Sequence, residues 1–356
     1  MTAKANRRTV PRREFRTASR TLSCLLAVIL AGACVSCKGK DKQPQRRVVL
    51  YCSADQAIAE PIIAEFEKQT GVKVLARFDT EASKTVGLVQ RLRAQAGSVE
   101  ADVFWSSEIF HTMRLAQEEL LAPFQDPAVA DWPAIFADPK GRWHGFALRA
   151  RVIGYSTGRV PADEAPRRLE DLLDAKWKGR IVMADPHFGT TGGDVASWFA
   201  HYGREKARAI LKGLKANGVR LVSGNSTAVR MVATGQADVC FTDTDDVYAA
   251  QRNGWSVALR FLKQGGEGAL VIPNTVARIK GGPNPEAAKA LIAFLLGGKA
   301  EEMLARSDSH NTPVHPSLVG REEFAKYAIP KALDINYEKV ADLLPDSISE
   351  AGEILR

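Results

Sequence analysis

The chain has 356 residues, of which 45% are hydrophobic and 25% charged, so it has enough apolar material for about two domain-sized cores. Its formal net charge of +8 comes from the N-terminal region, which carries +6 over residues 1–33 and +4 over residues 34–47. The remaining residues carry −2, which excludes a basic surface for a nucleic-acid backbone.

The N-terminal region has the pattern of a bacterial export signal. A cluster of arginines precedes an apolar run over residues 21–33, which is too short to span a bilayer as a mature helix. Small residues then lead to Cys34, the predicted site of lipidation; Cys37 is a second candidate, and cleavage without a lipid is the alternative. We therefore predict a signal peptide over residues 1–33, a tether over 34–47, and a periplasmic protein held to a membrane by a lipid anchor.

A repeating strand and helix pattern begins at Val48. Strands are predicted over residues 48–52, 72–78 and 102–105, and the apolar residues after the first strand recur at helical spacing. Strands that alternate with helices favour a parallel sheet covered by helices.

A long extended segment over residues 145–155 separates this pattern from a second one, and another extended segment follows over 268–279. Between them we predict a second set of elements: strands over 181–184, 219–222 and 237–241, a loop over 189–193, and helices over 195–200, 207–214, 228–234 and 247–251. The two extended segments indicate two crossings between two α/β lobes.

Polar side chains follow the predicted strands in both lobes. Ligands of open parallel sheets bind beyond the carboxyl ends of the strands, where helix N-termini offer free N–H groups. Each polar residue taken alone is better explained as a helix cap, but together they supply more oxygens than the caps need. The predicted ligand-binding residues are Ser53, Asp55, Thr80, Ser106, Ser107, Glu108, Arg149, Thr190, Thr191, Ser226, Asp243 and Asp245.

Two arginines of the first extended segment, Arg149 and Arg151, are separated by a single residue. Alternate residues of a strand point to the same side, so both guanidinium groups are expected on one face. One of them could clamp an anion through paired hydrogen bonds. A salt bridge between the lobes explains the pair equally well.

Six segments in chain order resemble the periplasmic ferric-binding branch of the solute-binding proteins of ABC transporters: LYCSADQAIAEPIIAEFEKQTGVKV, ADVFWSSE, RARVIGY, GTTGGD, FTDTDD and GALVIPNTVARI. The resemblance runs from about Val48 to the C-terminal helices. It implies an α/β, two-lobed periplasmic-binding-protein-like fold with two hinge strands. Lobe 1 would comprise residues 48–150 plus 270–356, and lobe 2 residues 151–269. It also implies a monomer that closes on its ligand and presents it to an ABC permease in the inner membrane.

Members of this branch commonly hold iron with two adjacent tyrosines in the second lobe. The corresponding loop, residues 242–246, reads TDTDD and has no tyrosine pair, while Tyr248 lies a helical turn further on. Carboxylates could replace phenolates because hard cations take oxygen donors. An iron site would then use Asp55, Glu108, Asp243 and Asp245.

The competing ligand is an organic anion such as a phosphorylated sugar or an aminophosphonate. Its phosphoryl group would be bound by hydroxyls, helix N-termini and Arg149. No cofactor is expected under either reading, since Fe³⁺ would be cargo.

A secreted enzyme of the same bilobal fold is the alternative from another functional class. The patterns GxSxG, HExxH and GxxxxGK[ST] are absent from the sequence after the export signal, and the six histidines of the chain are scattered. We therefore predict a receptor without catalytic residues.

Overall fold

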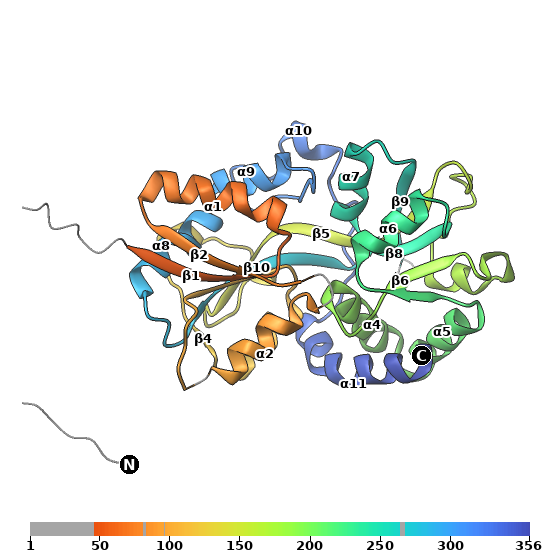
Figure 1. Cartoon of the computed structure of the whole chain (residues 1–356), viewed down its shortest axis with the longest axis horizontal. Helices are drawn as coiled ribbons and strands as arrows, with labels where there is room; N and C mark the ends of the chain where they lie inside the picture. Colours follow the sequence, from red (N-terminus) through yellow and green to blue (C-terminus); the bar gives the residue numbers. More distant parts are fainter. Residues whose placement is uncertain (1–45, 81–82, 96, 264–267) are drawn as a thin grey trace, which may run out of the picture. The chain divides into compact units, whose positions relative to one another are not determined.

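One long strand, β5 (Trp143–Ser156), takes part in two β-sheets (Figure 1). The computed structural model describes residues 46–80, 83–95, 97–263 and 268–356. The first half of β5 pairs with β10 (Val271–Ile279), and its second half pairs with β8 (Val239–Asp243) and β9 (Val257–Phe261). A strand of 14 residues, all but one of them buried, is long enough to serve both sheets.

The first sheet combines parallel and antiparallel strands. Its parallel strands are β1 (Arg47–Cys52), β2 (Lys73–Phe78) and β3 (Val103–Ser106). β10 runs antiparallel between β3 and β5, and β4 (Leu121–Ala122) pairs with β10.

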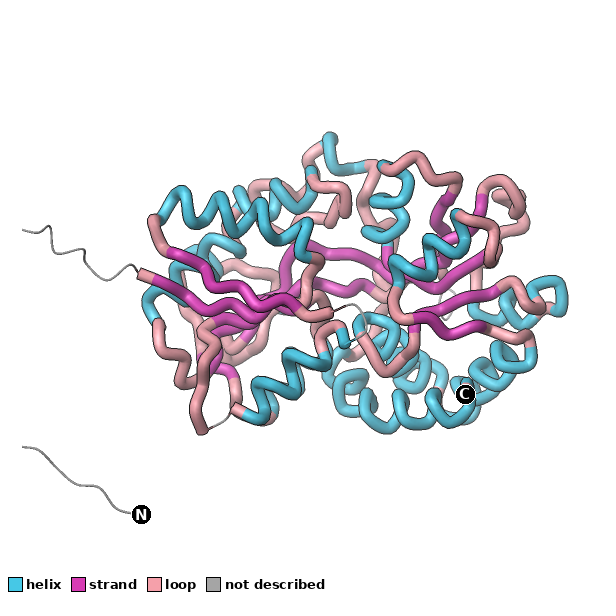
Figure 2. The backbone as a smooth tube through the Cα atoms, viewed as in Figure 1, coloured by secondary structure: helices cyan, strands magenta, loops and turns pink. Residues whose placement is uncertain are grey.

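The second sheet has the order β5, β8, β6, β7, with β9 on the other side of β5. Here β6 (Ile181–Ala184) runs parallel to both β7 (Arg220–Val222) and β8. Figure 2 shows the two groups of strands joined through the central strand. The strands and helices predicted for both lobes are confirmed, and so is the α/β fold.

Helices cover both faces of each sheet, as parallel strands require. Successive side chains of β1 show this, because Leu50 packs in the core on one face of the sheet and Tyr51 packs in the core on the other face. The helices against the first sheet are α1 (Gln56–Thr70), α2 (Val86–Ala94), α3 (Phe110–Gln117), α8 (Pro285–Leu295) and α9 (Gly298–Arg306). Those against the second sheet are α4 (Gly189–Tyr202), α5 (Arg204–Ala216), α6 (Asn225–Ala233) and α7 (Thr244–Arg252). The short helix α10 (Glu322–Ala325) and α11 (Tyr337–Leu355) end the chain.

The segment 189–193 was predicted as a loop, and this prediction was wrong. It forms the first turns of α4. Its glycines are needed for close packing, because a Cβ on Gly193 would lie 2.3 Å from the ring of Phe110, and one on Gly192 would lie 2.6 Å from the carbonyl oxygen of Pro186. Glycine is a poor helix former, which is why the sequence alone suggested a loop.

The last helix, α11, adds a connection between the two sheets that the sequence did not indicate. Its first half, including Tyr337 and Leu344, packs in a core of the first sheet. Its last residues, including Ala351 and Leu355, pack in a core of the second sheet beside α4 and α5 (Figure 1). The predicted lobe boundaries stay a prediction, and α11 contributes to both lobes.

The predicted signal peptide, Cys34 and residues 34–45 of the predicted tether fall outside the described residues. The last residue of the predicted tether, Arg47, already belongs to β1. Within the described ranges, the structure contains no helix with the length and apolar character needed to cross a membrane.

Candidate functional site

A small pocket lies where the two sheets meet, beside the middle of β5. Its volume is about 30 Å³, which is room for roughly one or two water-sized groups. Its lining comes from the strand ends of both sheets, as the rule for open α/β sheets predicts. The predicted residues that line it are Asp55, Ser107, Arg149, Thr190, Thr191, Asp243 and Asp245.

Three aspartates around the start of α7 form the acidic wall of the pocket. Asp243 ends β8, and Asp245 and Asp246 lie in the first turn of α7. One carboxylate oxygen from each of them lies within 4.8 Å of the others. The Asp243 side chain accepts no capping hydrogen bond from α7, so these carboxylates are left to interact across the pocket.

Asp243 is held by positive and neutral donors on several elements. Arg151 Nη1 donates to Asp243 Oδ1 at 2.8 Å, while Thr190 Oγ1 and Asn225 Nδ2 donate to Oδ2 at 2.7 and 3.1 Å. Burial alone would raise the pKa of Asp243, but Arg151 and Arg149 hold it below its usual value. Asp243 is therefore an ionised carboxylate at neutral pH.

Asp245 and Asp246 have less positive charge around them. Arg149 Nη1 donates to Asp245 Oδ2 at 2.8 Å, whereas Oδ1 of Asp245 is buried and has no hydrogen-bond partner among the residues described. Burial raises the pKa of Asp245, and Arg149 offsets only part of this effect. For Asp246, burial followed by the charges of Asp245 and Asp243 raises the pKa well above its usual range. Both carboxyls would be stabilised by an added cation.

The guanidinium groups of Arg149 and Arg151 lie on the same side of β5, as predicted. Arg149 also donates through Nη2 to the carbonyl oxygen of Ser107, which directly follows β3 of the first sheet. Arg151 Nε donates to Asp194 Oδ2 on α4 at 3.1 Å, in addition to its bond to Asp243. Both arginines therefore form salt bridges, as one of the two interpretations predicted. Arg149 connects the two sheets across the pocket through its contacts with Ser107 and Asp245.

The wall from the first sheet carries both signs of charge. Asp55, just before α1, forms an ion pair with Lys84. Burial opposes ionisation of Asp55, but the charge of Lys84 and its hydrogen bond lower the pKa. Ser107 rests on a buried hydroxyl cluster, in which Ser53 Oγ accepts from the Ser107 N–H at 2.8 Å and from Thr85 Oγ1 at 3.1 Å.

The structure does not place Glu108 in the pocket, contrary to expectation. Its carboxylate accepts from the backbone N–H of Phe110 at 2.7 Å and of His111 at 3.2 Å, at the N-terminus of α3. The residue is 1% exposed. Glu108 is thus a helix cap, the alternative that composition alone could not separate from a ligand.

Four further predicted residues also lie outside the pocket lining, for different reasons. Ser53 is buried below Ser107, and Ser106 bonds to Glu108 instead of facing the pocket. Thr80 is exposed and bonds to Ser83 at 2.6 Å, and Ser226 is exposed at the start of α6.

Eight lining residues were missing from the predicted set: Lys84, Ala184, Phe188, Gly189, Ser223, Gly224, Asn225 and Asp246. Asp246 and Asn225 each adjoin a residue that was predicted, so a wider window around each strand end would have found them. Lys84 had no such signal. Its ammonium group pairs with Asp55 at the pocket, and its carbonyl oxygen accepts from the N–H of Gly189 at 3.1 Å, which joins the two lobes.

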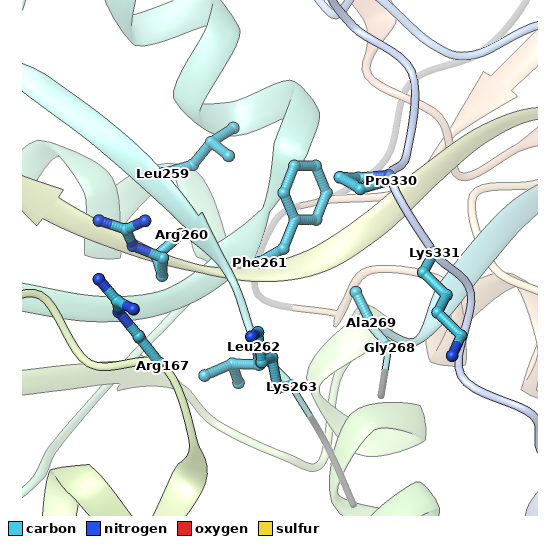
Figure 3. Close-up of a pocket in the computed structure, with 10 residues that line it drawn as sticks. All are labelled: Arg167, Leu259, Arg260, Phe261, Leu262, Lys263, Gly268, Ala269, Pro330 and Lys331. Carbon is cyan, nitrogen blue, oxygen red and sulfur yellow. The ribbon is translucent and has the colours of Figure 1, made fainter. Parts of the chain in front are cut away.

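Other pockets of the described residues are larger than this one. A pocket of about 220 Å³ adjoins it and shares Asp55, Asp245 and Asp246. A third pocket, about 620 Å³, contains none of the predicted residues and has basic side chains such as Arg167 and Lys263 beside apolar ones such as Phe261 (Figure 3). We assign the candidate site to the small pocket because the charged groups from both sheets converge there.

Comparison with known proteins agrees with this architecture. The family model described as "Bacterial extracellular solute-binding protein" matches residues 48–307. Iron uptake protein A1 of Synechocystis sp. is 28% identical, over 86% of this chain and 88% of that protein. The Fe(3+)-binding periplasmic protein of Serratia marcescens is 25% identical, over 84% of this chain and 90% of its own length. The crystal structure of apo ferric ion-binding protein A from Pasteurella haemolytica is 26% identical, with a TM-score of 0.78 over 87% of this chain and 98% of that one.

Proposed function

We propose that this chain, which belongs to the bacterial extracellular solute-binding proteins, captures a hard metal cation between its lobes, with ferric iron as the first candidate. The membership confirms the predicted resemblance and the predicted class, a ligand-binding component of an importer. The observation that carries the proposal of a cation is the group of three aspartate oxygens within 4.8 Å of one another. Carboxylate oxygens are donors that hard cations prefer.

The charge of the pocket supports a cation over an anion. Four lining residues are aspartates, at positions 55, 243, 245 and 246, and only Lys84 and Arg149 in the lining are basic. Arg151 adds no excess of positive charge because it is paired with Asp194 as well as Asp243. A bound cation would favour the ionised forms of Asp245 and Asp246 and so lower their pKa values. A phosphoryl group would instead add negative charge beside these carboxylates.

The size of the pocket supports the same choice. Hydrogen bonds from Arg149 to Asp245 and from Gly189 to Lys84 already join the two walls. The small pocket itself, about 30 Å³, suits an ion with one small ligand. A hexose phosphate would have to extend into the adjoining pocket of about 220 Å³.

The names of the similar proteins also favour iron, although the donors here would differ. No tyrosine is found among the described residues that line the pocket. Tyr248, the nearest in sequence, packs instead against His310 and Tyr327, with ring centroids 5.8 and 5.0 Å away. Asp243, Asp245 and Asp246, with Asp55 from the first lobe, would replace phenolates as the ligands.

The proposed partner and location of the protein follow from its family. An ABC permease of the inner membrane would receive the cation from the closed receptor. Acylation at Cys34 would hold the receptor to a membrane surface in the periplasm, and a mass shift of a tryptic N-terminal peptide would detect the lipid.

Calorimetric titration of the metal-free protein with ferric citrate tests the proposal. We expect one equivalent of iron per chain, and a loss of affinity of at least about 100-fold in the double variant Asp245→Asn/Asp246→Asn, since charged donors to a buried cation are removed. Asp163→Asn, which removes an exposed carboxylate elsewhere, is the matched control and should bind as the parent does.

Fructose 6-phosphate and 2-aminoethylphosphonate should be titrated in parallel. Tight binding of either without metal, together with no retention of iron, would replace the cation by an organic anion as the cargo.

A further inference from the structure

The hinge strand β5 contains an irregularity two residues before Arg149. Its register with β10 shifts there: Phe146 is opposite Asn274 and Leu148 is opposite Pro273, so Ala147 is an extra residue with no partner on β10. Ala147 has a φ of 45°, a left-handed conformation that a residue with a Cβ rarely adopts. This geometry is a β-bulge.

The bulge decides where the later side chains of β5 point. Successive residues of a strand face opposite sides, so one extra residue moves every following side chain to the other face. Arg149 and Arg151 both follow the bulge. Without it, they would face away from Ser107 and the aspartates that they contact in this structure.

A buried carboxylate from another element holds the bulge. Glu301 on α9 is 1% exposed and accepts from the N–H of Ala147 at 2.6 Å. The same carboxylate accepts from Val314 N–H at 2.9 Å and from the N–H of His315. It therefore ties the strained residue to the segment after α9, whose Thr312 also pairs with Leu148.

The opposite side of the bulge is held as well. Asn274 Nδ2 donates to the carbonyl oxygen of Ala147 at 2.7 Å, while Asn274 Oδ1 accepts from Trp105 Nε1 at 3.2 Å. Both polar groups of the Ala147 backbone are thus bonded to side chains instead of to a neighbouring strand. Such an arrangement persists only where its surroundings fix it.

We propose that Glu301 is a positioning residue for the ligand pocket: by binding the N–H of Ala147 it maintains the bulge that directs Arg149 to Ser107 and Asp245. Glu301 does not line the pocket and acts through the backbone of β5. The expected effect on ligand affinity rests on the proposed function, whereas the effect on Arg149 does not.

A ligand-free thermal unfolding cycle of Glu301→Leu and Arg149→Met tests this directly. We expect each single variant to lower the melting temperature and the double variant to lower it by less than the sum. The reason is that the ion pair of Arg149 with Asp245 is already lost when the bulge is lost. Additive shifts would overturn the proposal whatever the cargo is.

A second arm uses ferric citrate as the probe. Glu301→Leu should weaken binding by at least about tenfold, and adding Ala147→Gly should recover part of the loss, because glycine adopts the left-handed conformation without strain. Glu301→Gln, which keeps one acceptor oxygen, should lose less, and Glu302→Leu on the same helix is the matched control. If the parent protein binds iron and Glu301→Leu binds it equally well, the positioning role is excluded. If the parent does not bind iron, the proposed cargo fails, and the unfolding cycle still decides on Glu301.

Discussion

The strand ends of the two sheets carry the same kinds of residue but use them differently. After β3 in the first sheet, Glu108 is saturated by N–H groups of α3, and Ser106 bonds to it. After β8 in the second sheet, Asp243 makes no capping bond to α7, and Asp245 keeps a buried oxygen without a partner among the residues described.

The difference comes from where each helix begins relative to the acid. Glu108 is followed closely by Phe110, the first residue of α3, so its longer side chain folds back onto the free N–H groups. Asp245 and Asp246 are already inside the first turn of α7 and project across the pocket toward Arg149 and Lys84. A polar residue after a strand is therefore a site residue only where its own helix does not bind its oxygens.

The largest effect is expected where the second sheet buries an ionised network. Arg151→Met would leave Asp243 and Asp194 without the cation that both contact, and Arg151 is 1% exposed. We expect a loss of about 3–5 kcal/mol in the free energy of unfolding, measured with urea. A loss below about 1 kcal/mol would show that Arg149 and the hydroxyl donors suffice to hold Asp243.

A pair of matched variants distinguishes the capping role after β3 from the proposed ligand-binding role after β8. Glu108→Gln should lower the free energy of unfolding by about 1–2 kcal/mol, since it weakens the cap of α3, and leave iron affinity unchanged. Asp245→Asn should instead reduce the affinity for ferric citrate about tenfold and leave the free energy of unfolding nearly unchanged. Comparable loss of affinity in both variants would contradict the contrast between the two sheets.

The pH dependence of stability should differ between neighbouring aspartates. The folded pKa of Asp246 is raised above its ordinary value of 3.8, so its contribution to stability is complete below that value and is lost as the pH rises through the folded pKa. Asp246→Asn should therefore raise the melting temperature of the metal-free protein at neutral pH, and the gain should disappear toward pH 3.8. For Asp243, whose folded pKa is lowered, Asp243→Asn should destabilise at neutral pH and have less effect as the pH falls below 3.8.

The smallest effects are expected at predicted residues that lie outside the pocket lining. Thr80→Ala and Ser226→Ala alter exposed side chains, so the free energy of unfolding should change by no more than about 0.5 kcal/mol. Their affinities for ferric citrate should match that of the parent protein in the same titration. A clear loss in Thr80→Ala would mean that the first lobe contributes more to the ligand than the present pocket indicates.

The sequence alone determined the export signal pattern, the order of strands and helices, the long strand now seen as β5, and the edge of each sheet where the candidate site lies. These features depend on local periodicity, on caps and on the geometry of parallel strands, all of which are properties of short segments. The sequence also determined that Asp243 and Asp245 follow a strand of the second sheet, and that Arg149 and Arg151 share a face.

Only the tertiary structure decided which of the polar strand ends form one pocket. Glu108 and Asp245 look alike in the sequence, but the position of the N–H groups of α3 and the proximity of Arg149 separate them. Lys84 and Glu301 carry no local signal, because their contacts with Asp55 and with Ala147 are created only by folding. The same holds for the glycines of α4, which permit close packing against Phe110 and are not predictable from helix propensity.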